Sequence, residues 1–203
     1  MFSKSGISFR FMRLHRIMTT TPETHPAYVA GTWVLDSTHS EVTFSVKHLA
    51  ISKVRGIFER FTASIVTADD PAKSTVEASI EVASINTNQK DRDKHLRTND
   101  FFKADEFPNI SFSSSSVLLK DDDITVVGDL TMRGITKSVT LAGEFGGTVI
   151  DGYGQTKAGF TAATKINRHD YGVSWNAALE AGGLTLGDEI SINFELQFIL
   201  EAA

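Results

Sequence analysis

The stretch Glu-Ile-Ser-Ile-Asn-Phe-Glu-Leu-Gln-Phe-Ile-Leu-Glu, residues 189–201, decides the fold class of this 203-residue chain. Apolar side chains occupy every second position from Ile190 to Leu200, and polar side chains fill the positions between them, with Ile199 as the exception. Successive side chains of a strand point to opposite faces, so the alternation predicts a β-strand with one apolar face. A helix would scatter the same residues around its circumference.

The same period of two recurs at residues 42–46, 76–82, 110–118, 124–132, 139–145 and 160–166. Residues 54–67 change phase part-way, which a bulge or bend near Glu59-Arg60 would explain. Turn-forming groups such as Asp151-Gly152 separate the runs. No helices alternate with these strands, so the pattern excludes a parallel α/β sheet and favours an antiparallel barrel or a sandwich.

Two segments interrupt the strand pattern. Residues 89–98 are nearly all charged and predict a short surface helix. Residues 171–187 are apolar and too long for a simple hairpin turn, and they predict a short helix or a loop over a barrel mouth. We expect the apolar pairs Phe101-Phe102 and Leu184-Leu186 to cover that opening.

Composition excludes several classes of protein. The net charge of −5 gives no long-range attraction to nucleic acid or to an anionic membrane surface. Cys is absent, which excludes disulfides and thiolate metal sites. No apolar run approaches the roughly 18 residues that span a bilayer, so we expect no integral membrane segment.

The N-terminal part differs from the rest of the chain. Arginines at positions 10, 13 and 16 interrupt its apolar residues, whereas a secretory signal needs an unbroken apolar run. A transit peptide and a true start at Met18 both remain open. We predict that residues 1–28 form a disordered or mis-annotated extension and linker, that residues 29–203 form the barrel, and that the protein is cytoplasmic.

The interior of the barrel has two possible descriptions. A barrel of about eight strands is just wide enough to be filled by its own side chains or to hold one small ligand. The predicted inward faces mix large residues such as Phe44 and Phe112 with small ones such as Ala78 and Ala162. The mixture of sizes favours a cavity but is compatible with a solid core. The chain also has 14 Phe against 3 Tyr and 2 Trp, which indicates either an apolar core or an apolar cavity, so both descriptions stay open.

The sequence contains no recognisable catalytic or metal-binding motif. The six histidines lack the close spacing of a metal site, and no nucleophile elbow, phosphate loop or dinucleotide motif occurs. We therefore predict no catalytic residue, metal or cofactor. An enzyme acting on a lipid in the same cavity is the alternative, with its ionisable group drawn from His39, His48, Asp100 and His169.

Two basic clusters flank the predicted mouth. One comprises Lys47-His48 with Lys53 and Arg55, and the other comprises the basic residues of segment 92–97. Such a rim could contact a phosphate or another polar head group. Ordinary solvated surface charge is the alternative for each of these residues.

From about residue 31 to residue 201 the chain resembles the YceI-like, polyisoprenoid-binding family. The matching stretches are GTWVLD at 31–36, HS at 39–40, VTFSVKH at 42–48, VRGIF at 54–58, residues 91–112, GDLTMRGITK at 128–137, INRHDYG at 166–172 and GDEI at 187–190. They occur in the family's order and spacing, although the family often has Asn where this chain has Arg133.

The resemblance implies an all-β, lipocalin-like antiparallel β-barrel of about eight strands with one or two short helices. It also implies a cavity that holds a long-chain isoprenoid or fatty amphiphile for transport, storage or sequestration; an isoprenoid quinone is one such lipid. Many relatives are periplasmic, so that location or secretion is the alternative to a cytoplasmic one. A homodimer through an edge strand is possible. The candidate pocket residues are Phe44, Val46, Phe58, Ile80, Phe101, Phe102, Phe112, Leu130, Phe160, Trp175 and Phe194.

Overall fold

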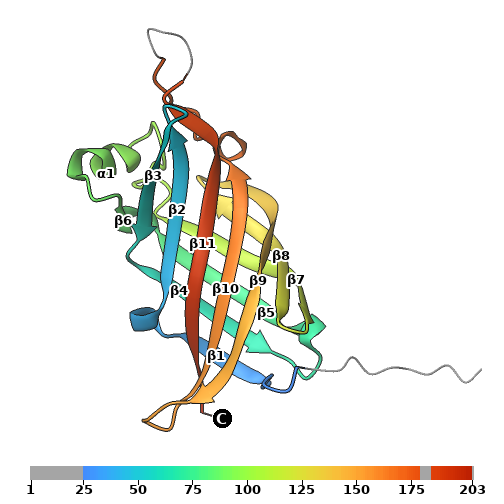
Figure 1. The fold of residues 1–203 in the computed structure, drawn as a ribbon. Helices are drawn as coiled ribbons and strands as arrows, with labels where there is room; N and C mark the ends of the chain where they lie inside the picture. Colours follow the sequence, from blue (N-terminus) through green and yellow to red (C-terminus); the bar gives the residue numbers. More distant parts are fainter. Residues whose placement is uncertain (1–24, 179–183, 203) are drawn as a thin grey trace, which may run out of the picture.

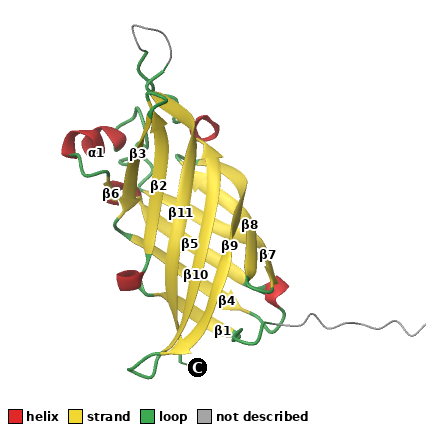
Figure 2. Ribbon diagram, in the orientation of Figure 1, coloured by secondary structure: helices red, strands yellow, loops and turns green. Residues whose placement is uncertain are grey.

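The computed structural model describes residues 25–178 and 184–202, and Figures 1 and 2 show that antiparallel strands make up most of them. The predicted N-terminal extension up to residue 24, and the middle of the predicted mouth segment at 179–183, lie outside the described residues. The strands are β1 Gly31–Leu35, β2 Glu41–His48, β3 Ser52–Phe58, β4 Phe61–Thr67, β5 Thr75–Glu81, β6 Ile85–Asn86, β7 Asn109–Lys120, β8 Asp123–Met132, β9 Ile135–Ile150, β10 Thr156–Asn167 and β11 Leu186–Leu200.

Eight of these strands form a closed ring. They pair in the order β1-β4-β5-β7-β8-β9-β10-β11, and β11 pairs with β1 to complete the ring. All of the pairings are antiparallel, and Trp33 of β1 lies opposite Leu200 of β11 at the closure. The predicted antiparallel barrel of about eight strands is therefore confirmed. Ring closure gives each of these eight strands a neighbour on both sides over at least part of its length.

The long strand β11 has two partners along one side. Its last residues, 198–200, pair with β1, and residues 186–195 pair with β2. A short 3₁₀ turn, Ser37–His39, separates β1 from β2. Asp36 caps this turn by accepting a hydrogen bond from the Thr38 backbone N–H. β1 and β2 thus act together as one interrupted strand.

The phase change predicted near Glu59-Arg60 is a bend between two strands. β3 ends at Phe58 and pairs with β2 and β6, whereas β4 begins at Phe61 and pairs with β1 and β5. The chain therefore changes neighbours at this point, and the inward-facing positions change phase with it.

The predicted surface helix is present as α1, Lys90–Leu96, and it is the one α-helix among the described residues. Gln89 caps it by accepting a hydrogen bond from the Arg92 backbone N–H. The predicted mouth segment contains no second α-helix in its described part. A 3₁₀ turn, Arg168–Tyr171, leads into this segment, which contains an isolated bridge between Ala178 and Leu184.

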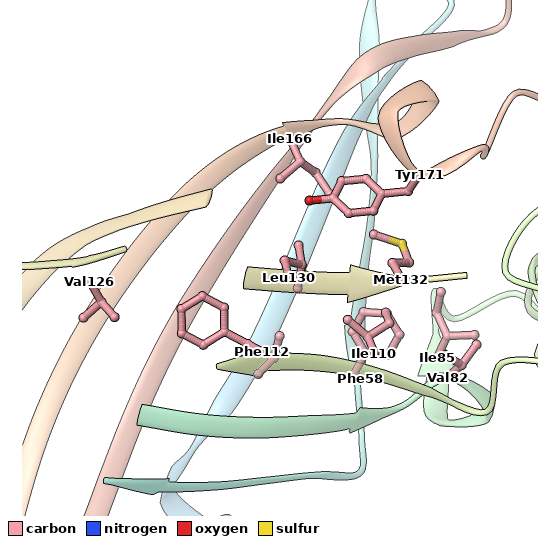
Figure 3. Close-up of a cluster of buried hydrophobic side chains, with 11 residues drawn as sticks. Phe58, Val82, Ile85, Ile110, Phe112, Val126, Leu130, Met132, Ile166 and Tyr171 are labelled. Atoms are coloured by element: carbon pink, nitrogen blue, oxygen red, sulfur yellow. The ribbon is translucent and has the colours of Figure 1, made fainter. Parts of the chain in front are cut away.

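Buried apolar side chains form two clusters. The larger, shown in Figure 3, lies in the half of the barrel nearer α1 and includes Phe58, Ile110 and Tyr171. The smaller surrounds Trp33 and Phe198 at the opposite end. None of the helices in the described part of the chain is long and apolar enough to span a membrane.

Candidate functional site: an apolar cavity along the barrel

The interior of the barrel is hollow. A cavity of about 710 Å³ extends from residues beneath α1 to Tyr28 and Ser74 at the other end. Inward-facing residues such as Phe44, Phe160 and Phe194 are only half-buried, and their side chains line this empty space. The structure thus decides between the two descriptions of the interior in favour of a cavity.

Every predicted pocket residue lines this cavity. The period-two alternation accounts for this result, since it directs one side of each strand toward the barrel axis. Whether these residues contact a bound molecule stays a prediction. The predicted cover over the mouth is only partly formed. Phe101, Phe102 and Leu186 line the cavity, but Leu184 is exposed and does not line it.

Cross-strand glycines keep two aromatic rings against the wall. A Cβ atom at Gly56 would come within 2.5 Å of the Phe44 ring, and one at Gly128 would come equally close to the Phe112 ring. Each ring therefore occupies the space that a neighbouring side chain would otherwise fill. As a result, these large residues coat the wall and leave the axis of the barrel open.

Polar groups line the cavity at the end where α1 lies, which we call the mouth. Gln89, Asp91 and Arg92 are exposed and also line the cavity, so the cavity reaches solvent here. Arg92 is held in place because its guanidinium donates to the Thr87 hydroxyl and backbone carbonyl, at 2.7 and 2.9 Å.

His95 also lines the mouth and sits in an aromatic corner. Its Nε2 lies 2.7 Å from an Asp100 carboxylate oxygen. The imidazole packs edge-on against Phe101 and Trp175, with ring centroids 5.0 and 4.9 Å away. These contacts fix the orientation of the imidazole beside the opening.

Arg168 is a buried cation at the mouth, with only 4% of its side chain exposed. It lines the cavity and donates hydrogen bonds to the backbone carbonyls of Gly187, Val173 and Trp175. Its Nη2 has no hydrogen-bond partner among the described residues and lies 3.6 Å from an Asp188 oxygen. Burial lowers the pKa of the guanidinium. Sequence reasoning missed Arg168, because its burial depends on contacts with residues 173, 175 and 187, which a local pattern does not reveal.

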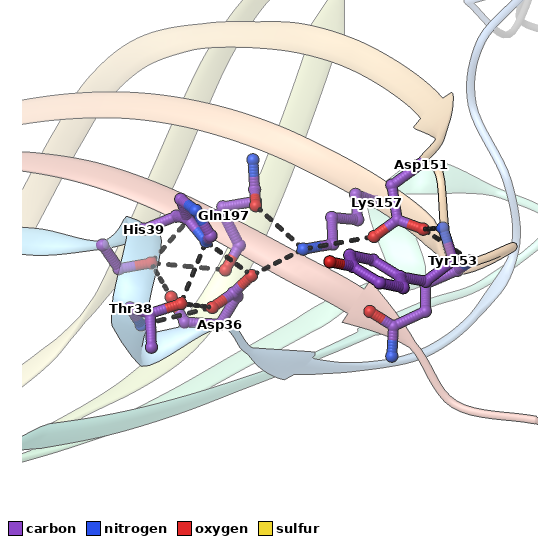
Figure 4. A network of polar contacts seen from close by, with 9 residues as sticks. Asp36, Thr38, His39, Asp151, Tyr153, Lys157 and Gln197 are labelled. Carbon is purple, nitrogen blue, oxygen red and sulfur yellow. Dashed lines mark hydrogen bonds and ion pairs between the residues drawn. The ribbon is translucent and has the colours of Figure 1, made fainter.

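The opposite end of the barrel, which we call the closed end, is stabilised by polar contacts outside the cavity. Lys157 Nζ lies 2.8 Å from Asp36 Oδ2 and 3.5 Å from Asp151 Oδ2, as Figure 4 shows. Thr38 donates its hydroxyl to Asp36 at 2.6 Å. The hydrogen bond from Lys157 is the main reason that the pKa of Asp36 lies well below its usual range.

The segment before β1 also contacts this end. The Tyr28 hydroxyl bonds to the Ala68 carbonyl at 2.8 Å and the Ser74 hydroxyl at 2.9 Å. Trp33 Nε1 donates to the Thr67 hydroxyl at 2.9 Å. Residues that line the cavity at this end are half-buried or buried. The cavity is therefore closed at this end, whereas it is open to solvent at the mouth.

Of the four groups named for a possible enzyme, only His48 lines the cavity. His39 bonds to Asp36 in the closed-end network, and His169 bonds to Asp188 on the outside of the barrel. Asp100 contacts the cavity only indirectly, through His95. Within residues 25–178 and 184–202, no three His, Asp or Glu side chains come close enough together to hold a metal ion.

The comparison with protein families agrees with this architecture. The model of the YceI-like domain matches residues 33–198. The chain belongs to the YceI-like family. The UPF0312 protein SAS2572 of Staphylococcus aureus, one curated relative, is 38% identical over 169 residues, which cover 82% of this chain and 96% of that protein.

Solved structures of YceI-like proteins show the same fold. The YCEI protein of Campylobacter jejuni is 32% identical, with a TM-score of 0.66, over 83% of this chain and 97% of that one. A polyisoprenoid binding domain from Saccharophagus degradans has a TM-score of 0.63 over 83% of this chain and 98% of that one. At 15% identity, the second likeness shows the fold alone.

Proposed function

We propose that this YceI-like protein binds a long-chain isoprenoid, or a similar amphiphilic lipid, and acts as a carrier or sequestering protein. The cavity carries the proposal, because its volume of about 710 Å³ falls within the range of roughly 300–1,000 Å³ found for small-molecule pockets. Its walls are apolar along the barrel axis and polar mainly at the mouth. An elongated molecule with an apolar tail and a polar head matches this distribution.

The energetics of such binding are sufficient. Burying one methylene group contributes about 0.8 kcal/mol, so ten groups contribute roughly 8 kcal/mol. Part of this free energy offsets the lost freedom of the lipid, and the remainder supports useful affinity. No chemical step is needed to account for the shape of the site.

The polar groups also suggest an orientation for the lipid. We place the tail toward Trp33 and Phe198 at the closed end, where the lining is apolar, and the head near Arg92 and Arg168 at the mouth. The Nη2 of Arg168, which has no hydrogen-bond partner among the described residues, suits a head group with acceptor oxygens. The polyisoprenoid binding domain from Saccharophagus degradans, which shares the fold, supports an isoprenoid as the class of tail.

Native mass spectrometry of the purified full chain, followed by organic extraction, tests the proposal. We expect an added mass that corresponds to one lipid per protein, released on denaturation, and uptake of geranylgeraniol by the lipid-free protein. Geranylgeraniol that is extracted after uptake should be chemically unchanged, whereas its conversion to another compound would favour the enzyme alternative. A purified protein that carries no lipid and takes up no geranylgeraniol would contradict lipid binding.

A further inference from the structure

The mouth carries exposed apolar side chains outside the cavity. Ile51, in the turn between β2 and β3, is 85% exposed, and Leu184 is 56% exposed. We call Leu49, Ala50, Ile51 and Leu184 the mouth tip. Exposed apolar groups gathered at one place on a protein surface indicate an interaction site.

The turn at the mouth tip contains two residues of types that rarely adopt its backbone conformation. Leu49 and Ala50 have φ angles of +54° and +59°. Hairpin turns with positive φ normally use Gly, Asn or Asp, which adopt this conformation at little cost. Leu and Ala are therefore poor choices for the turn itself. Their apolar character needs an explanation other than the backbone conformation.

Hydrogen bonds hold the mouth tip together. The Leu49 backbone N–H donates to the Thr185 carbonyl at 2.8 Å, and the Thr185 N–H donates to the Ala177 carbonyl at 3.0 Å. Figure 1 shows the β2–β3 turn and the segment that leads into β11 side by side at one end of the barrel. Ile51 and Leu184 are thus presented by two chain segments that are joined to each other.

Two cations lie just below the tip. Lys47 and Lys53 are exposed and lie directly opposite each other in the β2–β3 pair. Neither has an acidic side chain within 4.0 Å among the described residues, and like charges in this position repel each other. The acids of the neighbouring strand are already paired, Asp188 with His169 and Glu189 with Lys165. An external anion would relieve the repulsion.

The closed end provides a contrast. Ile150 and Tyr153, at the β9–β10 turn, are 70% and 93% exposed, so apolar exposure alone does not distinguish the two ends. Charge does, because the closed end carries three consecutive aspartates, Asp121 and Asp122 in the β7–β8 turn and Asp123 at the start of β8. An anionic surface would be repelled there and attracted at the mouth tip.

We propose that the mouth tip docks on an anionic phospholipid bilayer. Ile51 and Leu184 enter the interface between head groups and acyl chains, while Lys47 and Lys53 contact lipid phosphates. Docking in this orientation places the cavity mouth against the membrane, where a lipid can pass between the bilayer and the barrel. This reason for docking rests on the proposed lipid binding.

Flotation with phospholipid vesicles tests the proposal, using the purified full chain. We expect binding to vesicles of phosphatidylcholine with phosphatidylglycerol, and much less binding to phosphatidylcholine alone. Ile51→Asp should weaken binding by about tenfold, because it removes buried apolar area and adds a repelled charge. Ile150→Asp is the matched control, since it makes the same change at an exposed isoleucine of the closed end and should leave binding unchanged.

The cations have a separate test. Replacing both lysines (Lys47→Gln and Lys53→Gln) should reduce binding to the anionic vesicles by about tenfold or more and weaken its dependence on salt. Lys90→Gln together with Lys94→Gln, on the exposed face of α1, is the matched control with the same loss of charge. It should have a clearly smaller effect.

Three outcomes overturn docking: no vesicle binding by the unmodified chain, equal loss with Ile150→Asp, or equal loss with the α1 control. Geranylgeraniol uptake, measured on the same proteins by native mass spectrometry, separates the two proposals. Uptake without vesicle binding overturns only the docking. Loss of uptake in every variant and in the unmodified chain overturns the proposed function itself.

Discussion

The closed end and the mouth of the barrel use polar groups in different ways. At the closed end Asp36, Lys157 and Trp33 all find partners within the protein. Near the mouth the Arg168 Nη2 and the Tyr171 hydroxyl, both buried, have no hydrogen-bond partner among the described residues. A buried polar group without a partner reduces stability. The contrast indicates that the closed end provides stability, while the mouth holds groups and surfaces available to other molecules.

The largest effect on stability should come from breaking the closed-end network. Asp36→Asn removes the charge that pairs with Lys157, whose side chain is also largely buried. We expect the free energy of unfolding at neutral pH to fall by about 2–3 kcal/mol, since charged hydrogen bonds in buried sites contribute this much. Urea unfolding of the variant and the unmodified chain measures it. Equal stability would mean that Asp36 does not anchor this end.

The same network predicts a pH dependence. The hydrogen bond from Lys157, followed by that from Thr38, holds the pKa of Asp36 below its unfolded value of about 3.9. A lowered pKa stabilises the folded state above that unfolded value, and the contribution is lost as the pH falls toward the folded pKa. The gap in stability between the unmodified chain and Asp36→Asn should therefore narrow, without closing, when urea unfolding is repeated at about pH 3, because the unfolded carboxyl is then largely protonated while the folded one stays ionised. A gap that stays constant from pH 7 to pH 3 would contradict this explanation.

Two tyrosines provide a smaller comparison between the ends, beginning with Tyr28 at the closed end. Tyr28→Phe removes hydrogen bonds to the Ala68 carbonyl and the Ser74 hydroxyl. The free energy of unfolding should fall by about 1 kcal/mol, the usual net contribution of such bonds. Thermal unfolding followed by circular dichroism checks this loss, and an unchanged midpoint would rule out a stabilising role for the hydroxyl.

At the mouth, replacing a tyrosine by phenylalanine should have the opposite effect on the free energy of unfolding. Burial is the main reason that the pKa of Tyr171 rises to about 12, and its hydroxyl has no partner among the described residues. Tyr171→Phe should therefore raise the free energy of unfolding by up to about 1 kcal/mol, because it removes a desolvated polar atom from an apolar cluster. Equal destabilisation of both Phe variants would mean that the difference between the two ends does not hold for these groups.

Local patterns in the sequence predicted much of the fold. The alternation in residues 189–201 identified β11, and it also indicated that Phe194 faces inward. Phase within a strand is a local property, so it can be read without knowing which strands pair. For the same reason, the inward residues Phe44, Phe112 and Phe160 could be named in advance, and all three line the cavity.

Features that depend on distant contacts could not be predicted in this way. The bond from Trp33 to Thr67 exists because β1 pairs with β4, and Arg168 is held by backbone carbonyls of residues 173, 175 and 187, which follow it in the chain. The hollow interior depends on how rings such as that of Phe44 pack against glycines of the neighbouring strand. Periodicity carries no information on that packing, which is why a solid core and a cavity both remained possible.

The most direct test of the central claim, that the cavity holds a lipid tail, compares two adjacent alanines of β10. Ala162 lines the cavity, whereas Ala163 is exposed and lies outside it. Ala162→Trp should abolish uptake of geranylgeraniol in native mass spectrometry, because the indole fills the space that the tail would occupy. Ala163→Trp should load like the unmodified chain. Full loading of a folded Ala162→Trp protein would contradict the account.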